Sequence, residues 1–137
     1  MTDPAAGART ILVVDDEPVV RSVVGRLLRQ WDFNVVEADN GQSALLLTRN
    51  LKESLCLVIT DLAMPHMDGY QFASAFRPLY PDVPILFVTG KCPNELMGDL
   101  SSMQDRLIFK PFRPDALLDS VARVLESSRN NQRQVSA

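Results

Sequence analysis

The chain has 137 residues and a mass of 15.2 kDa, which corresponds to one domain with a single hydrophobic core. Its composition is 46% hydrophobic and 23% charged, which excludes a collagen, a coiled coil and a wholly disordered chain. The net charge of -3 and the pI near 5.1 argue against binding to nucleic acid or to an anionic membrane surface.

No membrane anchor or export signal is predicted. The apolar runs fall far short of the roughly 18 residues that span a bilayer, and Met1 to Pro4 lacks the basic and apolar parts of a signal peptide. We therefore expect a cytoplasmic protein. Cys56 and Cys92 have neither metal-ligand nor CxxC spacing, so both are expected to be free thiols.

Strands and helices are predicted to alternate along the chain. The strands are continuous apolar runs such as Ile11–Val14, which is typical of a sheet buried on both faces. The helices carry apolar residues at helical spacing, and Pro18 and Pro114 suit first turns. In chain order the elements are strand Ile11–Val14, helix Pro18–Trp31, strand Phe33–Glu37, a helix around Ala44–Leu51, strand Leu55–Thr60, helix Tyr70–Arg77, strand Val83–Thr89, a weakly helical segment Pro93–Met103, strand Leu107–Phe109 and helix Pro114–Ser127.

The segments between these elements contain turn and capping residues. Asp39-Asn40-Gly41 is turn chemistry with a candidate N-cap, and residues 62–69 form a loop punctuated by proline and glycine. Residues 10–127 are predicted to form the domain. The first nine residues and the polar tail 128–137 are predicted to be disordered.

This order of elements predicts an α/β fold with a doubly wound, five-stranded parallel sheet and helices on both faces. Right-handed crossovers favour the flavodoxin-like strand order 2-1-3-4-5. In such a sheet, ligands bind at the carboxyl ends of the strands, near the switch between the first and third strands.

Polar residues follow or end four of the predicted strands: Asp15 and Asp16, Asp61, Thr89, and Lys110. Three carboxylates at one rim repel by roughly 4 kcal/mol per pair at 4 Å and a dielectric constant near 20, so a cation must neutralise them. The absence of nearby His or Cys favours Mg²⁺ over zinc. A carboxylate beside Mg²⁺, a hydroxyl and an ammonium is suited to attack phosphorus, with Asp61 as the nucleophile.

Four motifs in this order resemble the receiver domain of bacterial two-component response regulators, of the chemotaxis-regulator type. They are ILVVDDEP, VITDLAMPHMDG, FVTG and IFKPF, and the resemblance covers Thr10 to Ser127. It implies a phosphorylation-dependent signalling switch that is not an enzyme acting on other substrates. It also implies a sensor histidine kinase or phosphotransfer protein as the donor, and a downstream protein as the target.

The resemblance assigns roles to individual residues. Asp61 would accept the phosphoryl group from a phosphohistidine. Asp16, Asp61 and the backbone carbonyl of Ala63 would hold Mg²⁺, with Asp15 acting mainly through a metal-bound water. Lys110 would pair first with Asp61 and then with the phosphoryl group.

The resemblance also bears on switching. Thr89 would donate a hydrogen bond to a phosphoryl oxygen, and the Lys110–Pro111 peptide bond is cis in the family. The output surface of the family is the fourth helix, the fifth strand and the fifth helix. Leu107 stands where the family often has Tyr or Phe, so we expect switching to depend on Thr89 and its loop. The other departures from the commonest pattern are Ala63, Lys91 and Arg113.

Other functions have weaker support in the sequence. A Mg²⁺-dependent phosphohydrolase acting through an aspartyl phosphate normally has a DxD pattern, which Asp15-Asp16-Glu17 lacks. A nucleotide-binding fold needs a Gly-rich loop after the first strand, and none is present. His66 is expected to be a solvated side chain. A purely structural interaction module stays open.

The setting of the domain is also open. It is either a stand-alone regulator, which Met1 and the short polar tail favour, or the receiver module of a hybrid histidine kinase. We expect a monomer or weak homodimer that signals through protein contacts and binds no nucleic acid.

Overall fold

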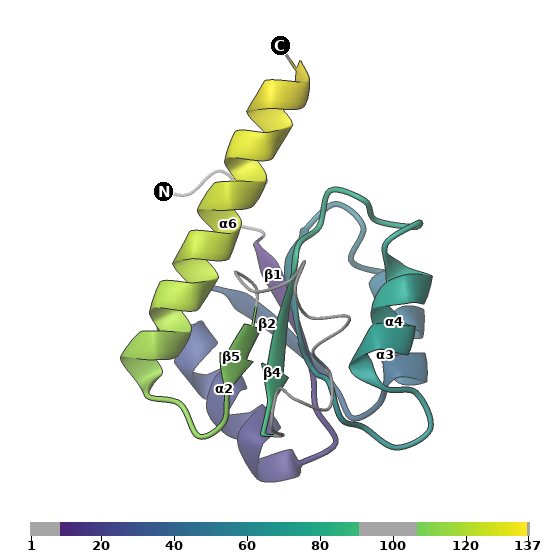
Figure 1. The fold of residues 1–137 in the computed structure, drawn as a ribbon, viewed down its shortest axis with the longest axis vertical. Coiled ribbons are helices and arrows are strands. Elements are labelled where there is room, and N and C mark those ends of the chain that lie inside the picture. The colour runs from purple at the N-terminus through teal and green to yellow at the C-terminus, as the bar shows by residue number, and fades with distance from the viewer. Residues whose placement is uncertain (1–8, 91–106, 137) are drawn as a thin grey trace.

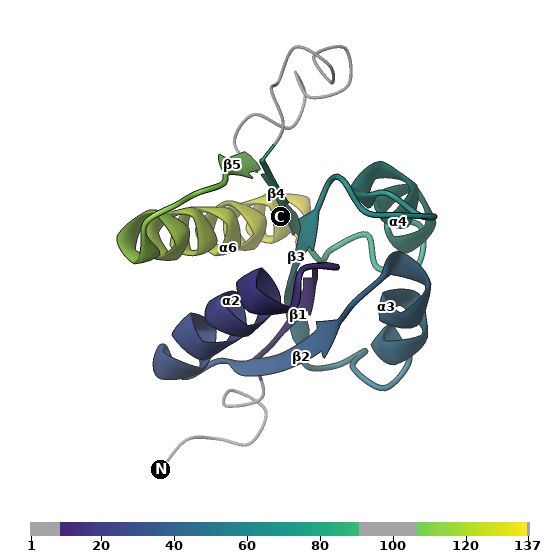
Figure 2. The same cartoon turned by 90° about the horizontal axis from the view of Figure 1, so that it is seen from below.

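A parallel five-stranded sheet lies between two layers of helices in the computed structural model, which describes residues 9–90 and 107–136 (Figures 1 and 2). The strand order is β2-β1-β3-β4-β5, so the predicted fold class and order are confirmed. The elements are β1 (Thr10–Val14), α2 (Pro18–Gln30), β2 (Asn34–Ala38), α3 (Gly41–Thr48), β3 (Leu55–Asp61), α4 (Gly69–Phe76), β4 (Ile85–Thr89), β5 (Leu107–Phe109) and α6 (Pro114–Ser136).

Helices α3 and α4 cover one face of the sheet, and α2 and α6 cover the other (Figure 2). Successive side chains of a strand point to opposite faces, so a continuously apolar strand contributes to both layers. In β1, Leu12 belongs to the same buried cluster as Phe76 of α4, whereas its neighbour Ile11 clusters with Leu28 of α2 and Leu117 of α6. The sheet is therefore the centre of two apolar layers.

Side-chain caps define the starts of α3 and α4. The predicted N-cap Asn40 accepts a hydrogen bond at Oδ1 from the backbone N–H of Ser43 at 2.7 Å. Asp68 and Gln71 form a reciprocal capping box at the start of α4. These caps end the loops that lead to the two helices on this face of the sheet.

Helix α6 is longer than predicted. It runs to Ser136, so the predicted helix end near Ser127 is wrong. The disorder predicted for the tail 128–137 stays a prediction. Residues 128–136 contain neither Gly nor Pro, and their Arg and Gln residues favour helix, so nothing in that sequence stops the helix. The prediction for residues 1–8, the weak helix Pro93–Met103 and the departure at Lys91 lie outside the described residues.

In the described ranges, no helix combines the length and the apolar character needed to cross a membrane. Cys56 is a free thiol, as predicted, and its Sγ donates to the carbonyl oxygen of Thr10 at 3.4 Å. Burial raises the pKa of this half-buried thiol, which keeps it protonated near neutral pH. Cys92 lies outside the described residues.

Candidate functional site

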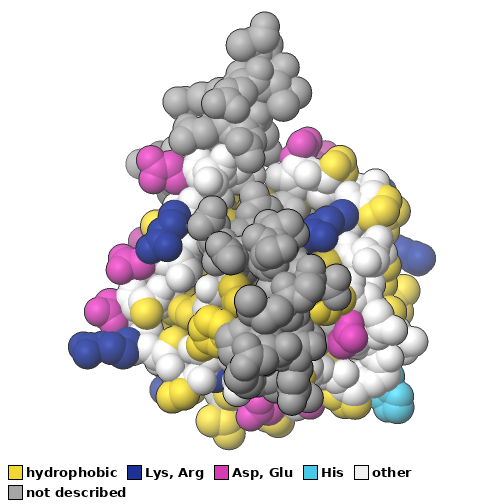
Figure 3. Space-filling view, viewed as in Figure 1, with side chains coloured by type: hydrophobic (Ala, Val, Ile, Leu, Met, Phe, Trp, Pro, Cys, Tyr) yellow, Lys and Arg dark blue, Asp and Glu magenta, His cyan; other side chains and the backbone are white. Residues whose placement is uncertain are grey.

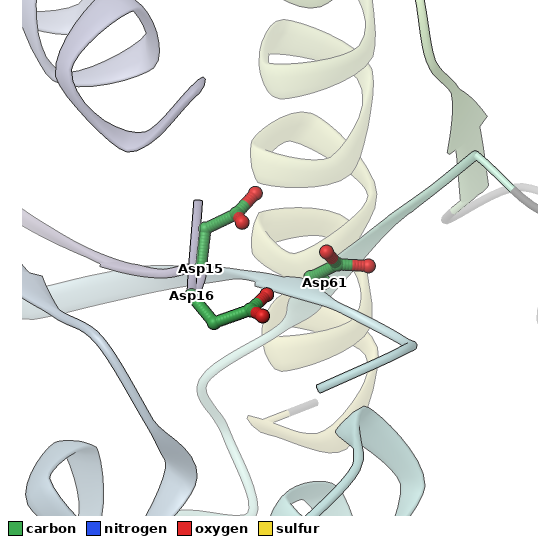
Figure 4. A group of neighbouring side chains, drawn as sticks. All are labelled: Asp15, Asp16 and Asp61. Atoms are coloured by element: carbon green, nitrogen blue, oxygen red, sulfur yellow. The ribbon is translucent and has the colours of Figure 1, made fainter. Parts of the chain in front are cut away.

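The predicted site residues lie at the carboxyl edge of the sheet. Asp15 follows β1, Asp61 ends β3, Thr89 ends β4 and Lys110 follows β5. Asp15, Asp16 and Asp61 each place one carboxylate oxygen within 4.8 Å of the others (Figure 4). The parallel order of β1, β3, β4 and β5 therefore brings together residues that are far apart in the sequence.

The ammonium group of Lys110 lies among three carboxylates. Its Nζ is 3.0 Å from Asp61 Oδ2, 3.1 Å from Asp15 Oδ2 and 2.9 Å from Glu17 Oε1. Burial opposes the charge on this ammonium, but the hydrogen bonds to Glu17, Asp61 and Asp15 outweigh burial and hold the pKa of Lys110 above its usual value. Lys110 therefore remains cationic at neutral pH.

Asp15 is a buried carboxylate, 4% exposed, while Asp16 beside it is exposed. Burial raises the pKa of Asp15; the backbone N–H of Glu17, 2.9 Å from Oδ1, and the nearby Lys110 oppose that rise. Arg21 Nη1 donates to the carbonyl oxygen of Asp15 at 2.6 Å, which ties the end of β1 to α2.

Asp61 is also buried, and its loop is held tightly. Its Oδ1 accepts a hydrogen bond from the backbone N–H of Ala63 at 3.1 Å. The N–H of Gly69 donates to the carbonyl oxygen of Leu62 at 2.8 Å, which brings the start of α4 against β3. A Cβ at Gly69 would lie 2.5 Å from the carbonyl oxygen of Asp61, so only glycine fits this close approach.

Thr89 and the segment after β5 complete the edge. Thr89 is fully buried, and its carbonyl oxygen accepts a hydrogen bond from the backbone N–H of Lys110 at 2.8 Å. The Lys110–Pro111 peptide bond is cis, as the resemblance implied. Leu107 is partly buried against the apolar layer that contains Phe87. His66 is exposed, as expected of a solvated side chain.

Two residues that contact this site were not singled out by sequence reasoning: Glu17, which binds Lys110, and Arg21, which binds Asp15. Glu17 continues the acidic run of Asp15 and Asp16 at the same strand end, and that run was the available signal. Arg21 lies one helical turn beyond Glu17 and carried no comparable signal.

The donor set suits a hard divalent cation. We define the carboxyl-edge group as Asp15, Asp16, Glu17, Asp61 and Lys110, which contains four carboxylates and one ammonium. Carboxylate oxygens favour Mg²⁺ over zinc, which is usually bound by histidine or cysteine. The clustered groups at this site are three aspartates, with no histidine or cysteine among them. Two of these aspartates are buried, so their charge is poorly screened by water and a bound cation would offset it. The residues present therefore fit Mg²⁺.

Comparison with known proteins identifies the family. The family model described as "Response regulator receiver domain" matches residues 11–122. The "Response regulator receiver protein CpdR" of Brucella abortus is 30% identical over 118 residues, which cover 85% of this chain and 97% of that protein. The "Sensor kinase CckA" of the same organism is 31% identical over 122 residues, which cover 88% of this chain. The chain spans only 13% of the length of CckA.

A solved structure agrees with these relatives. The structure of the Vibrio cholerae chemotaxis protein CheY4 is 29% identical, with a TM-score of 0.76, and the match covers 85% of this chain and 98% of that one. The match of the family model to most of the chain, the full-length match to CpdR and the shared fold lead to one conclusion. The chain belongs to the response regulator receiver domain family, the phosphorylation-dependent signalling switches of two-component systems.

Proposed function

We propose that the chain carries its signal as a phosphoryl group on Asp61, received from the phosphohistidine of a histidine kinase or phosphotransfer protein. The observation that carries this proposal is the contact of Asp61 Oδ2 with Lys110 Nζ at 3.0 Å, within a cluster of carboxylates of which Asp15 and Asp61 are buried. A nucleophilic carboxylate beside a fixed cation is what phosphoryl transfer to aspartate requires. The domain that performs this step is proposed to be residues 10–127.

In the transfer step, a carboxylate oxygen of Asp61 forms the new P–O bond as the P–N bond to the donor imidazole breaks. The electron pair of the broken bond remains on the imidazole nitrogen. Lys110 supplies positive charge toward the phosphoryl oxygens, and Thr89 is proposed to donate its hydroxyl hydrogen to one of them. The backbone N–H of Ala63 holds Asp61 in place through Oδ1.

Asp16, Asp61 and the carbonyl of Ala63 are proposed to hold Mg²⁺, with Asp15 acting through a water molecule. When bound, Mg²⁺ offsets the charge of the carboxylates and of the phosphoryl oxygens. The exposure of Asp16 beside buried Asp15 and Asp61 supports this arrangement, because an exposed carboxylate can receive the ion from solvent.

The output is proposed to be a protein contact rather than DNA binding. The net charge is negative, and in Figure 3 the Lys and Arg side chains of the described residues are scattered among Asp and Glu on the face shown. A nucleic-acid surface normally gathers its basic side chains into a patch. The downstream protein and the oligomeric state, a monomer or weak homodimer, are parts of the proposal.

Acetyl phosphate labelling tests the acceptor. The purified chain is incubated with acetyl phosphate with and without Mg²⁺, and the modified residue is mapped by mass spectrometry. We expect one phosphoryl group per chain, on Asp61 and only with Mg²⁺, and no labelling of Asp61→Asn. Asp68→Asn is the matched control, since it removes a carboxylate of the same loop and Asn caps a helix as well as Asp. Undiminished labelling of Asp61→Asn would reject the assignment.

A further inference from the structure

All three N–H donors of the Lys110 ammonium are matched by carboxylates in this structure. A lysine ammonium has three such donors, and Glu17, Asp61 and Asp15 lie 2.9, 3.0 and 3.1 Å from Nζ. Phosphorylation removes the negative charge of Asp61 itself, so a phosphoryl oxygen that binds Lys110 takes the place of Asp61 and competes with Asp15 and Glu17 for the ammonium. Which of these two carboxylates yields determines what the phosphoryl group competes with.

Of these two, Glu17 is the partner whose release costs less. The Asp15 side chain is 5% exposed, so this carboxylate would lose its cation without gaining water. The Glu17 side chain is 58% exposed and returns to solvent when its contact breaks. Exposed ion pairs contribute much less than buried ones, because water replaces the partner.

The Glu17 side chain has no role in capping α2, although it occupies the N-cap position. It makes no side-chain hydrogen bond to the first turn of that helix. The backbone N–H of Glu17 donates to Asp15 Oδ1 at 2.9 Å, a contact that any residue except proline retains. Substitution of the side chain therefore changes the contact with Lys110 and leaves the backbone of the loop able to bind Asp15.

We propose that Glu17 is a positioning residue that occupies the third N–H of Lys110 in the unphosphorylated chain and competes with the phosphoryl group for it. This inference rests on the proposed function, since it takes Asp61 as the acceptor. Glu17 fixes the ammonium near Asp61 before transfer, and its displacement opposes the phosphorylated state. The contact thus tunes how readily the switch is set.

The affinity for beryllofluoride, a non-covalent mimic of the phosphoryl group, tests the competition at saturating Mg²⁺. Glu17→Asp keeps the charge but shortens the side chain by one methylene, so it separates the contact from the charge. Glu17→Gln keeps the length and removes the charge. Asp39→Asn is the control, because Asp39 is an exposed carboxylate just after β2, at the same edge of the sheet, whose hydrogen bond is with Asn40 rather than Lys110.

We expect both Glu17 variants to bind beryllofluoride about two- to fivefold more tightly than the wild type, the range for an exposed ion pair. Asp39→Asn should match the wild type. If Glu17→Asp equals the wild type while Glu17→Gln and Asp39→Asn tighten binding equally, the effect is one of net charge and the proposal is overturned. Weaker binding by both Glu17 variants also overturns it. A wild type that binds no beryllofluoride rejects the proposed function itself.

A second measurement needs neither metal nor phosphoryl mimic. Hydrogen exchange of the Lys110 ammonium with water, followed by nitrogen-15 NMR at low temperature, reports whether Glu17 holds the third N–H. Exchange should be faster in Glu17→Asp and Glu17→Gln than in the wild type and Asp39→Asn. Equal exchange rates in all four proteins would overturn the proposal while leaving the assignment of Asp61 intact.

Discussion

Two charged clusters lie beside α2, and they are built in opposite ways. In the carboxyl-edge group, four carboxylates share one ammonium, which contacts three of them directly. In the second cluster, which we call the Glu37 cluster, two guanidinium groups face one carboxylate: Arg29 Nη2 lies 3.1 Å and Arg21 Nε 3.5 Å from Glu37. Arg21 also binds the carbonyl of Asp15, so the two clusters are neighbours.

The difference separates a ligand site from a structural contact. The Glu37 cluster has enough cations to satisfy its carboxylate, and its side chains are between 20% and 51% exposed, so it is complete in water. The carboxyl-edge group keeps an excess of negative charge partly out of water, which is unfavourable until a cation binds. Uncompensated charge in one cluster and compensated charge in the other indicate which of the two suits a cation.

The largest difference that we expect between the two regions is in the stability lost when a glycine is replaced by alanine. At Gly69, a Cβ would lie 2.5 Å from the carbonyl oxygen of Asp61 and 2.8 Å from the Cα of Leu62, both rigid backbone atoms. At Gly25, a Cβ would meet the ends of the Glu37 and Arg29 side chains at 3.0 and 3.2 Å, which can move aside. Gly69→Ala should lower the free energy of unfolding by about 3 kcal/mol.

Gly25→Ala should change the free energy of unfolding by no more than about 0.5 kcal/mol, since alanine favours the helix and offsets the crowding. Urea denaturation of both variants measures the difference. Equal losses of stability would mean that the backbone at Asp61 is no more tightly packed than the Gly25 position of α2.

Mg²⁺ affinity gives the next largest contrast. Asp16→Ala should weaken Mg²⁺ binding about tenfold or more, because it removes a proposed ligand from the carboxyl-edge group. Glu37→Gln, which removes the carboxylate of the Glu37 cluster, should leave the affinity within about twofold. Calorimetric titration of folded variants provides the measurement. An unchanged affinity in Asp16→Ala would reject Asp16 as a ligand.

In the absence of metal, neutralising a carboxylate should change the free energy of unfolding in opposite directions in the two clusters. The folded-state pKa of Asp15 is raised, so the protonated carboxyl favours the folded state, and that contribution is lost as pH rises through the folded pKa. Asp15→Asn should therefore raise the free energy of unfolding at pH 7 by about 1 kcal/mol, with no gain below about pH 4. Glu37→Gln should lower it by up to about 1 kcal/mol.

Thermal or urea unfolding in chelator-treated buffer over this pH range tests these signs. A loss of stability in Asp15→Asn at pH 7 would show that Lys110 already compensates the buried carboxylate fully. Added Mg²⁺ should reduce the advantage of the variant, because the ion relieves the same repulsion in the wild type.

The smallest expected effect concerns how the signal leaves the carboxyl edge. The Leu107 side chain has no polar group and packs against an apolar cluster, whereas Thr89 is fully buried at the end of β4. Beryllofluoride binding changes the NMR chemical shifts of the backbone amides of residues 107–112. These changes should be reduced less by Leu107→Ala than by Thr89→Ala, with both variants compared as folded proteins. The reverse order would assign the coupling to Leu107.

The strand ends could be predicted because polar residues interrupt runs that are otherwise apolar. Asp15, Asp61 and Lys110 stand out on that basis, and the parallel strand order places them at one edge. The contact between Glu17 and Lys110 could not be predicted in the same way. It joins residues 93 positions apart, and it depends on side-chain reach rather than on any local pattern.

The close approach at Gly69 and the length of α6 also escaped prediction. A glycine before a helix is compatible with many turns, and only the packing of α4 against β3 shows that a side chain is excluded. Apolar periodicity fades near Ser127 and predicts an end there, but a helix needs a stop signal to end, and α6 continues to Ser136. Periodicity indicates which residues are buried, and it does not indicate how far an exposed helix continues.

The central claim is that the excess negative charge of the carboxyl-edge group makes a Mg²⁺-dependent phosphoryl site at Asp61. Fluorine-19 NMR of bound beryllofluoride, with and without Mg²⁺, tests it most directly. We predict that binding saturates at one per chain with Mg²⁺, and that it is lost without Mg²⁺ and in Asp61→Asn. Equal binding in the absence of Mg²⁺, or undiminished binding by Asp61→Asn, would contradict the claim.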